Sequence, residues 1–308
     1  MALCNIQFLS LPCFLFNLIF MILYFIKTVI LLGVFYGMYA LFLKNNKSLR
    51  WNRLYLVFTI LLSILLPLLN GFSFGPMLAS MLHNGMFSDV LNVIDVLANQ
   101  LNKTTQYYGK IIFGFYMLGL LWGLLRIVLG FVVIRRIQQS AVYETIAEQP
   151  VYFSEHIESP FSYFKRIYIP SQYKKSSMLH VILLHEMAHV NKLHSRDKIL
   201  FSFLQAFCWM NPFVYLYHKE LDWNHVYEAD ELVTLEINTV DYCQDYLLKS
   251  KSGLSPTRLV NHFFYQPIQK RIDMLNKKSY HSIGLQVLVV LVILMCSILM
   301  LVLQSDVK

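Results

Sequence analysis

Charged residues are scarce in this chain: they make up 14% of its 308 residues, whereas 56% of the residues are hydrophobic. A soluble domain carries roughly a quarter charged residues and about 45–50% apolar ones. Glycine (12 residues) and proline (9 residues) are also few, which excludes a fibrous or linker-rich chain. An aromatic content of 15% excludes a disordered chain. The composition therefore predicts a membrane protein with several spans and one modest soluble part.

Paired cysteines and long acidic runs are lacking as well. The five cysteines form no CxxC pair and four of them lie in apolar segments, so we expect free thiols and no disulfide framework. The net charge is +8, and the basic residues flank apolar stretches. Such flanks are typical of the cytoplasmic side of a membrane protein, and we expect no direct nucleic-acid partner.

Four apolar stretches are long enough to cross a bilayer, which takes about 20 residues. We predict spans near residues 22–43, 54–69, 111–134 and 283–303. The second is interrupted near its end by Pro67, because proline lacks a backbone donor. Residues 1–20 are surplus to the first span, which makes Met21 a candidate start residue.

The orientation follows from the lysines and arginines next to the spans, which gather on the cytoplasmic side of membrane proteins. They are Lys44, Lys47, Arg50, Arg53, Arg135, Arg136, Lys270, Arg271, Lys277 and Lys278. We therefore divide the chain into a membrane region (1–134) with an outward loop (70–110), a cytoplasmic portion (135–281), and a fourth span with a short outer tail (282–308).

Several features inside the apolar segments stand out. Arg126 in the third span either pairs with a polar group or takes part in signalling, because a charge inside a membrane is costly. Glycine pairs spaced as GxxxG allow close helix packing or are chance spacing. They are Gly33 with Gly37 and Gly119 with Gly123. The uncharged stretch 199–217 contains Asn211-Pro212, and we predict a helix–break–helix against the membrane surface there, not a fifth span.

The strongest chemical signal is His185-Glu186-Met187-Ala188-His189. Two histidines four residues apart lie on one face of a helix, where they can bind one Zn²⁺. Glu186 projects beside them and can take a proton from the attacking water. The alternative is a surface helix with incidental histidines, but the apolar run just before the motif favours a buried helix.

A zinc site normally has a third protein ligand. The segment 220–231 contains five acidic residues and one histidine in a helical composition. It is either a solvated acidic helix face or a second helix packed beside the first, which would bring a further ligand to the zinc.

These residues resemble the membrane-embedded zinc peptidases of the BlaR/MecR antirepressor group, in the compact form without an extracellular sensor domain. The resemblance covers roughly residues 21–300. The motifs that carry it are His185 to His189, His194-Ser195-Arg196-Asp197, Asn211-Pro212-Phe213, Glu228-Ala229-Asp230, Asn52-Arg53-Leu54-Tyr55, Pro160-Phe161-Ser162, Lys270-Arg271-Ile272 and Met274-Leu275.

The resemblance implies that His185 and His189 bind zinc, that Glu186 is the general base, and that Asp230 orients a ligand histidine. It also implies a glutamate ligand four residues before Asp230, where this chain has Val226. Valine cannot bind a metal. We therefore predict Glu228 as the third ligand, although it lies about 200° around the helix from position 226.

There are three alternatives to Glu228: Asp222, His225, or no third ligand at all.

We expect a mostly α, four-helix polytopic membrane protein with a helical HExxH zincin-like portion between spans three and four. The expected function is a zinc-dependent endopeptidase of the cell membrane that acts in transmembrane signalling and cleaves a cytoplasmic protein such as a transcriptional repressor.

Membrane lipid is the other expected partner, and a homo-oligomer is left open. A catalytically degenerate signalling or adaptor protein on a peptidase scaffold is the alternative, favoured by Val226. A transporter is a third possibility that rests only on the spans and Arg126; it predicts two repeated halves, which the sequence does not show.

Overall fold

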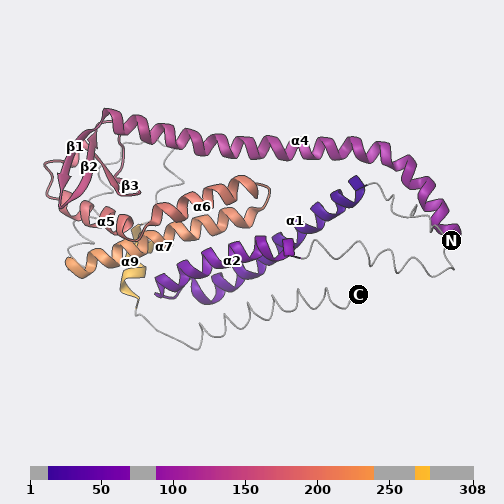
Figure 1. The fold of residues 1–308 in the computed structure, drawn as a ribbon. Coiled ribbons are helices and arrows are strands. Elements are labelled where there is room, and N and C mark those ends of the chain that lie inside the picture. Colours follow the sequence, from indigo (N-terminus) through magenta and orange to yellow (C-terminus); the bar gives the residue numbers. More distant parts are fainter. Residues whose placement is uncertain (1–12, 70–87, 239–267, 278–308) are drawn as a thin grey trace, which may run out of the picture. The chain divides into compact units, whose positions relative to one another are not determined.

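The computed structural model describes residues 13–69, 88–238 and 268–277 (Figure 1). The predicted fourth span lies outside the described residues. Contacts divide the chain into two units, of which the second comprises Tyr39–Val57 and Trp122–His281. The predicted catalytic motif belongs to this second unit.

The described part of the chain contains three helical stretches long and apolar enough to cross a membrane: Tyr24–Leu43, Leu49–Leu68 and Gly109–Ser140. The first runs through helix α1 (Cys13–Met38) into a π-helical turn (Tyr39–Leu43), and the second is helix α2 (Leu49–Leu69). The first three predicted spans are therefore confirmed as long apolar helices. Pro67 does not interrupt the second one, because α2 continues through it for two more residues.

Polar side chains inside these two helices bond to backbone carbonyls. The Thr28 hydroxyl donates to the carbonyl of Phe25 at 2.8 Å, and the Ser63 hydroxyl donates to that of Thr59 at 2.7 Å. Tyr24 of α1 reaches α2, where it donates to the carbonyl of Ile64 at 3.2 Å. Such bonds satisfy polar groups without water, as a membrane interior requires.

Helix α4 (Ser88–Ser140) is 53 residues long and contains the third apolar stretch. Residues 88–110, which were predicted to be part of an outward loop, are helical and continue directly into that stretch. Arg126 is exposed on α4 and has no hydrogen bond or ion pair to any residue that the structure describes.

A four-stranded sheet, which the sequence did not predict, follows α4. Its strands are β1 (Val142–Ile146), β2 (Gln149–Ser154), β3 (Phe161–Tyr163) and β4 (Arg166–Pro170), in the spatial order β1-β2-β4-β3. β2 and β4 are parallel, and the two outer pairs are antiparallel. The predicted helical portion thus also contains a small sheet.

One face of this sheet forms a core with the helix that carries the HExxH motif. Val151 and Phe153 of β2 lie opposite Ile167 and Ile169 of β4, so their side chains share a face. They pack against Ile182, Leu183 and Val190 of helix α5 (Leu179–Asn191). This core fixes the orientation of α5.

Among its described residues, the second unit contains three further helices: α6 (His194–Phe207), α7 (Pro212–Glu236) and α9 (Ile268–Asn276). The predicted helix–break–helix at 199–217 is confirmed. Pro212 begins α7, and the Asn211 side chain caps it by accepting a bond from the Phe213 amide at 3.0 Å. α7 turns back beside α5 and α6, so the motif helix and the acidic segment lie together (Figure 1).

Gly123 of α4 lies directly against Ala206 of α6. A Cβ at position 123 would stand 2.8 Å from the Ala206 Cβ, so only glycine allows this approach. Gly37, by contrast, has no neighbouring atom within 4 Å. One glycine of the two predicted pairs therefore has a packing role, and its partner is α6, which is not one of the three apolar spanning stretches.

Candidate metal centre

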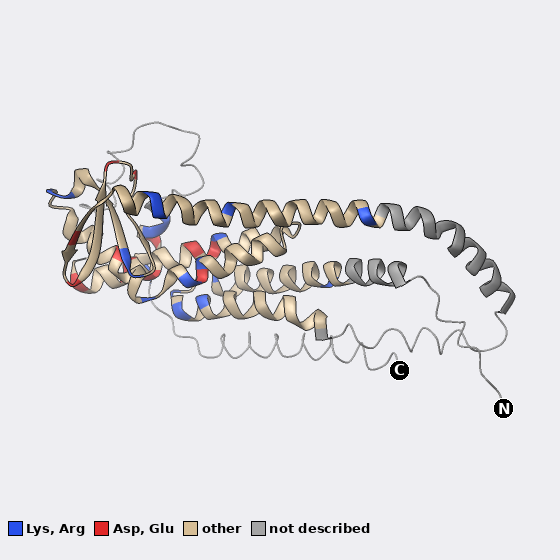
Figure 2. Ribbon diagram, turned by 45° about the horizontal axis from the view of Figure 1, so that its top comes forward, with Lys and Arg blue, Asp and Glu red and all other residues tan. Residues whose placement is uncertain are grey.

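The HExxH motif is buried on α5. His185 and Glu186 each expose 5% of their surface, and the apolar side chains one turn earlier anchor the helix to the sheet. Acidic and basic residues lie close together on this helix and its neighbours α6 and α7 (Figure 2). Burial of so many ionisable groups is costly, and each should have a bonding partner.

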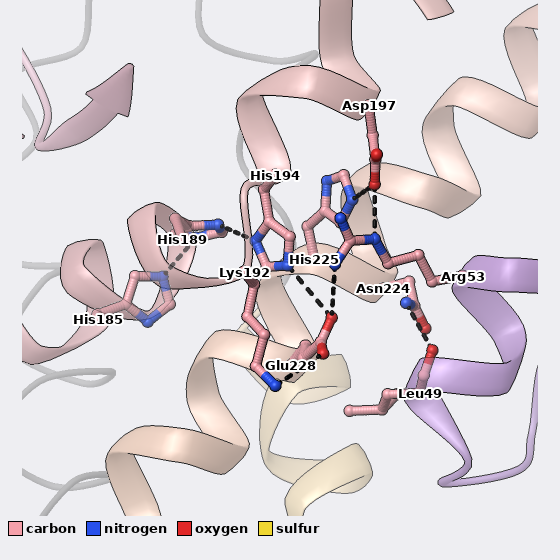
Figure 3. A network of polar contacts seen from close by, with 10 residues as sticks. All are labelled: Leu49, Arg53, His185, His189, Lys192, His194, Asp197, Asn224, His225 and Glu228. Atoms are coloured by element: carbon pink, nitrogen blue, oxygen red, sulfur yellow. Dashed lines mark hydrogen bonds and ion pairs between the residues drawn. The ribbon is translucent and has the colours of Figure 1, made fainter. Parts of the chain in front are cut away.

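The Nε2 atoms of His185 and His189 lie 3.3 Å apart (Figure 3). Zinc binds imidazole nitrogen at about 2.0–2.1 Å, so two nitrogens on one tetrahedral ion are separated by about 3.3–3.4 Å. The observed distance matches this separation. The two predicted ligand histidines thus present their nitrogens as two corners of a zinc site would require.

The other ring nitrogen of His185 is held by Asp230. Its Nδ1 lies 3.2 Å from the Asp230 carboxylate, which Arg271 of α9 binds with two bonds of 2.8 and 2.5 Å. Burial raises the pKa of Asp230, but Arg271 outweighs burial and lowers this pKa to about 2. The ionised carboxylate can only accept, so His185 carries its proton on Nδ1 and keeps the Nε2 lone pair free.

His189 is held in the same way through a second histidine. Its Nδ1 lies 2.7 Å from Nδ1 of His194, whose Nε2 lies 3.2 Å from the Glu228 carboxylate. Burial raises the pKa of Glu228, but the bond from His194 and the nearby cations lower it below its ordinary value. Burial lowers the pKa of both histidines, so both are neutral at pH 7.

These partners fix the protons along the chain of three groups. Glu228 accepts from the His194 Nε2–H, so the Nδ1 of His194 must accept from the Nδ1–H of His189. The Nε2 of His189 then has a lone pair, as does the Nε2 of His185, and the two face each other at 3.3 Å. Two facing lone pairs repel each other, and a cation between them removes the repulsion.

The residues present therefore fit two ligand positions of a zinc ion. Among the described residues, no group of three or more histidine, cysteine, aspartate or glutamate side chains converges on one point. A third protein ligand is thus not in place in this part of the chain.

Glu186 lies beside the two histidines in a dry environment. Burial raises its pKa above the ordinary value, while His185 and the Ser162 hydroxyl of β3 act in the opposite direction. A carboxylate whose pKa is raised toward neutrality can both take and return a proton during a reaction. The position and the pKa of Glu186 suit the predicted general base.

The sequence profile described as BlaR1 peptidase M56 matches residues 97–275, which is more than half of the chain. The chain belongs to the M56 peptidase family. The match includes the HExxH motif and the Glu-Ala-Asp segment, and it confirms the resemblance seen in the sequence. A comparison with curated proteins gives no match.

In this M56 chain, the predicted third ligand lies on the far side of His194. Glu228 is 4% exposed, and its carboxylate lies near Lys192 (3.6 Å) and Arg53 (3.8 Å) in addition to His194. No contact joins it to His185 or His189. Direct binding of zinc by Glu228 stays a prediction, and it requires the side chain or the helix to turn.

The two alternative ligands have partners of their own. Asp222 lies 3.9 Å from Lys198 and 3.8 Å from His218. His225 is fully buried, and its Nε2 lies 2.9 Å from the Asp197 carboxylate. Neither residue makes a contact with the HExxH histidines in the part of the chain described here.

Four residues that shape this site were not predicted to belong to it: Arg53, Lys192, His194 and Arg271. Three of them stand in motifs that carry the family resemblance, each near an acidic residue of another motif in space. Arg53 donates to Asp197 at 2.6 Å, and Arg271 binds Asp230. The opposite charges in separate motifs could have suggested ion pairs, but the spacing along the chain does not show which charged residues form a pair.

Proposed function

We propose that this M56 chain is a zinc-dependent endopeptidase of the cell membrane. His185 and His189 would hold the zinc through Nε2, Asp230 would hold His185, and Glu186 would be the general base. The observation that supports this most is the pair of Nε2 atoms, 3.3 Å apart, whose opposite nitrogens are both engaged.

Zinc, when bound there, would lower the pKa of a water towards about 7 and polarise the peptide carbonyl. Glu186 would take a proton from the attacking water and later deliver it to the nitrogen of the leaving amine. Its raised pKa supports this role, because a carboxylate with a raised pKa is a stronger base and takes the proton of the water more readily.

The substrate would bind as an extended peptide along β3. This strand forms one edge of the sheet, lies against α5, and contains Ser162 next to Glu186. An edge strand offers unpaired backbone groups to which a peptide can add as a further strand. A peptide on this edge would pass close to the general base.

The cellular role follows from the apolar helices and the basic residues beside them. We propose a multi-pass protein of the cell membrane whose residues 135–281 face the cytoplasm, because lysines and arginines flank that portion. The substrate would then be a cytoplasmic protein, such as a transcriptional repressor, and its cleavage would transmit a signal across the membrane. Membrane lipid would be the other partner.

A second candidate function is a signalling or adaptor protein without catalysis. It is favoured by Val226, which stands at the expected ligand position, and by the two-nitrogen site among the described residues. Such a protein would use the same membrane helices and the same buried ionic network, but it would not cleave peptides.

The test is cleavage by the full chain, purified in detergent and loaded with zinc. A set of quenched fluorescent peptides should be cleaved, the chelator 1,10-phenanthroline should stop the reaction, and added zinc should restore it, because the site needs the metal. Cleavage that continues in the chelator contradicts the proposal. A zinc-loaded protein that cleaves none of the peptides favours the adaptor.

A further inference from the structure

We propose that Glu228 acts on the metal centre through His194, as a positioning pair for His189. In this arrangement neither residue touches the metal. The pair sets which nitrogen of His189 carries the proton and which way its ring points. The inference rests on the proposed zinc function, and it gives Glu228 a different role from the direct ligand predicted from the sequence.

The hydrogen-bond chain permits only one order of protons. The Glu228 carboxylate has no proton to give, so Nε2 of His194 donates to it over 3.2 Å. The remaining nitrogen of His194 then accepts from Nδ1 of His189 over 2.7 Å. His189 is left with a free lone pair on Nε2, the nitrogen that faces His185.

A sharp turn between α5 and α6 makes this contact possible. Leu193 has a φ of 58°, in the left-handed region, and it stands at the N-terminus of α6. This conformation reverses the chain within a few residues, so His194 faces back towards His189, five positions earlier. His194 is 1% exposed and cannot exchange this partner for water.

The ring of His194 is also fixed from its face. It stacks on the ring of His225 at 4.0 Å with an angle of 15° between the planes (Figure 3). His225 is in turn bonded to Asp197, and Asp197 to Arg53. Stacking on His225 therefore holds the plane of the His194 ring, and the bonds to His189 and Glu228 prevent the ring from rotating within that plane.

Two cations hold the carboxylate of Glu228 close to His194. Lys192, at the end of α5, and Arg53, on α2, lie 3.6 and 3.8 Å from its two oxygens. Arg53 thus contacts two carboxylates: that of Asp197, which binds His225, and that of Glu228. These cations favour a charged carboxylate at this place and oppose its movement towards the zinc position.

Each of the two proposed ligand histidines is then held by a carboxylate, one directly and the other through a further histidine. Asp230 binds His185 directly, whereas Glu228 reaches His189 through one intervening imidazole. Partners of this kind orient a metal-binding histidine and raise its basicity, and their loss typically weakens metal binding by about 10–100-fold.

The positioning role and direct ligation make opposite predictions for Glu228→Gln. The glutamine oxygen can still accept from His194, so a positioning pair keeps working, whereas a neutral amide is a poor zinc ligand. Glu228→Ala removes the acceptor in both cases. The comparison of these two variants therefore separates the two roles.

The experiment is zinc affinity, measured by competition with a chromophoric chelator, on the full chain in detergent. We expect Glu228→Gln to stay within about fivefold of the wild type and Glu228→Ala and His194→Ala each to weaken binding by about 10–100-fold. The double Ala variant should be no weaker than the worse single variant, because both act through one chain of bonds. The visible spectrum of the Co²⁺-loaded Glu228→Gln protein should match that of the wild type.

Glu236→Ala is the matched control, since it removes an exposed acidic residue at the end of the same helix. It should leave zinc affinity unchanged, and thermal unfolding should show that every variant is folded. Loss of zinc and a changed Co²⁺ spectrum in Glu228→Gln would establish direct ligation and overturn the inference, as would wild-type affinity in Glu228→Ala. A wild-type protein that binds no zinc removes the proposed function itself, and the inference with it.

Discussion

Replacing Glu186 with glutamine should lower the rate of peptide cleavage by about 10²–10⁴-fold, while the protein keeps its zinc. Glutamine has the size of glutamate but cannot take a proton from the attacking water. The buried position next to Ser162 and His185 can accommodate it, because burial already favours an uncharged side chain there. Initial rates and zinc content should be measured on the same sample.

Glu236→Gln is the control for this substitution, because Glu236 is exposed at the end of α7. It should cleave at the wild-type rate. If Glu186→Gln also cleaved at that rate, another group would have to take the proton, and the assignment of the general base would be wrong.

Replacing Arg271 with methionine should destabilise the protein by about 3–5 kcal/mol. The Asp230 side chain is fully buried, and Arg271 gives it two of its bonds. Without the guanidinium, a charged carboxylate is left buried beside His185. Denaturant unfolding of the full chain in detergent measures the change.

Lys270→Met is the matched control, since it removes the same charge from the neighbouring position of α9. Lys270 is exposed and lies 4.8 Å from the centre of the Trp223 ring. Its loss should cost at most about 1 kcal/mol, as expected for an exposed contact between a cation and a ring. Equal losses in both variants would show that Arg271 acts only as a surface charge.

The parts of this structure that the sequence predicts well depend on local signals. The spacing of His185 and His189 requires one helical face, and the apolar run before them predicts burial, which Ile182 and Leu183 show. Asn211-Pro212 is both a helix stop and a helix start, and α7 begins there. The length and composition of the apolar stretches likewise predict helices that are long enough to cross a membrane.

The sheet escaped prediction because its turns lack the usual residues. The β1–β2 connection places Ala147 and Glu148 at φ values of 49° and 61°, and the β3–β4 connection places Phe164 at 52°. Glycine and asparagine normally occupy such positions and mark a hairpin in the sequence. The two central strands pack against α5, but no local sequence pattern marks the turns that connect the strands.

The contacts that hold the candidate metal centre escaped prediction for a different reason. Its bonds join residues that are far apart in the sequence: His194 and Glu228 are 34 positions apart, and Arg53 and Asp197 are 144 apart. The motif spacing places two histidines on one helix face, but it says nothing about what holds their second nitrogens. That information comes only from the packing of α6 and α7 against α5, and from the arginines that α2 and α9 bring to α6 and α7.

The zinc content of the wild-type chain, compared with that of His189→Ala, tests the central claim most directly. Both proteins would be purified in detergent, incubated with micromolar zinc, desalted and analysed for metal. The facing nitrogens of His185 and His189 predict about one zinc ion per wild-type chain and a small residual fraction in the variant. A folded wild type that retains no more zinc than His189→Ala would contradict the account.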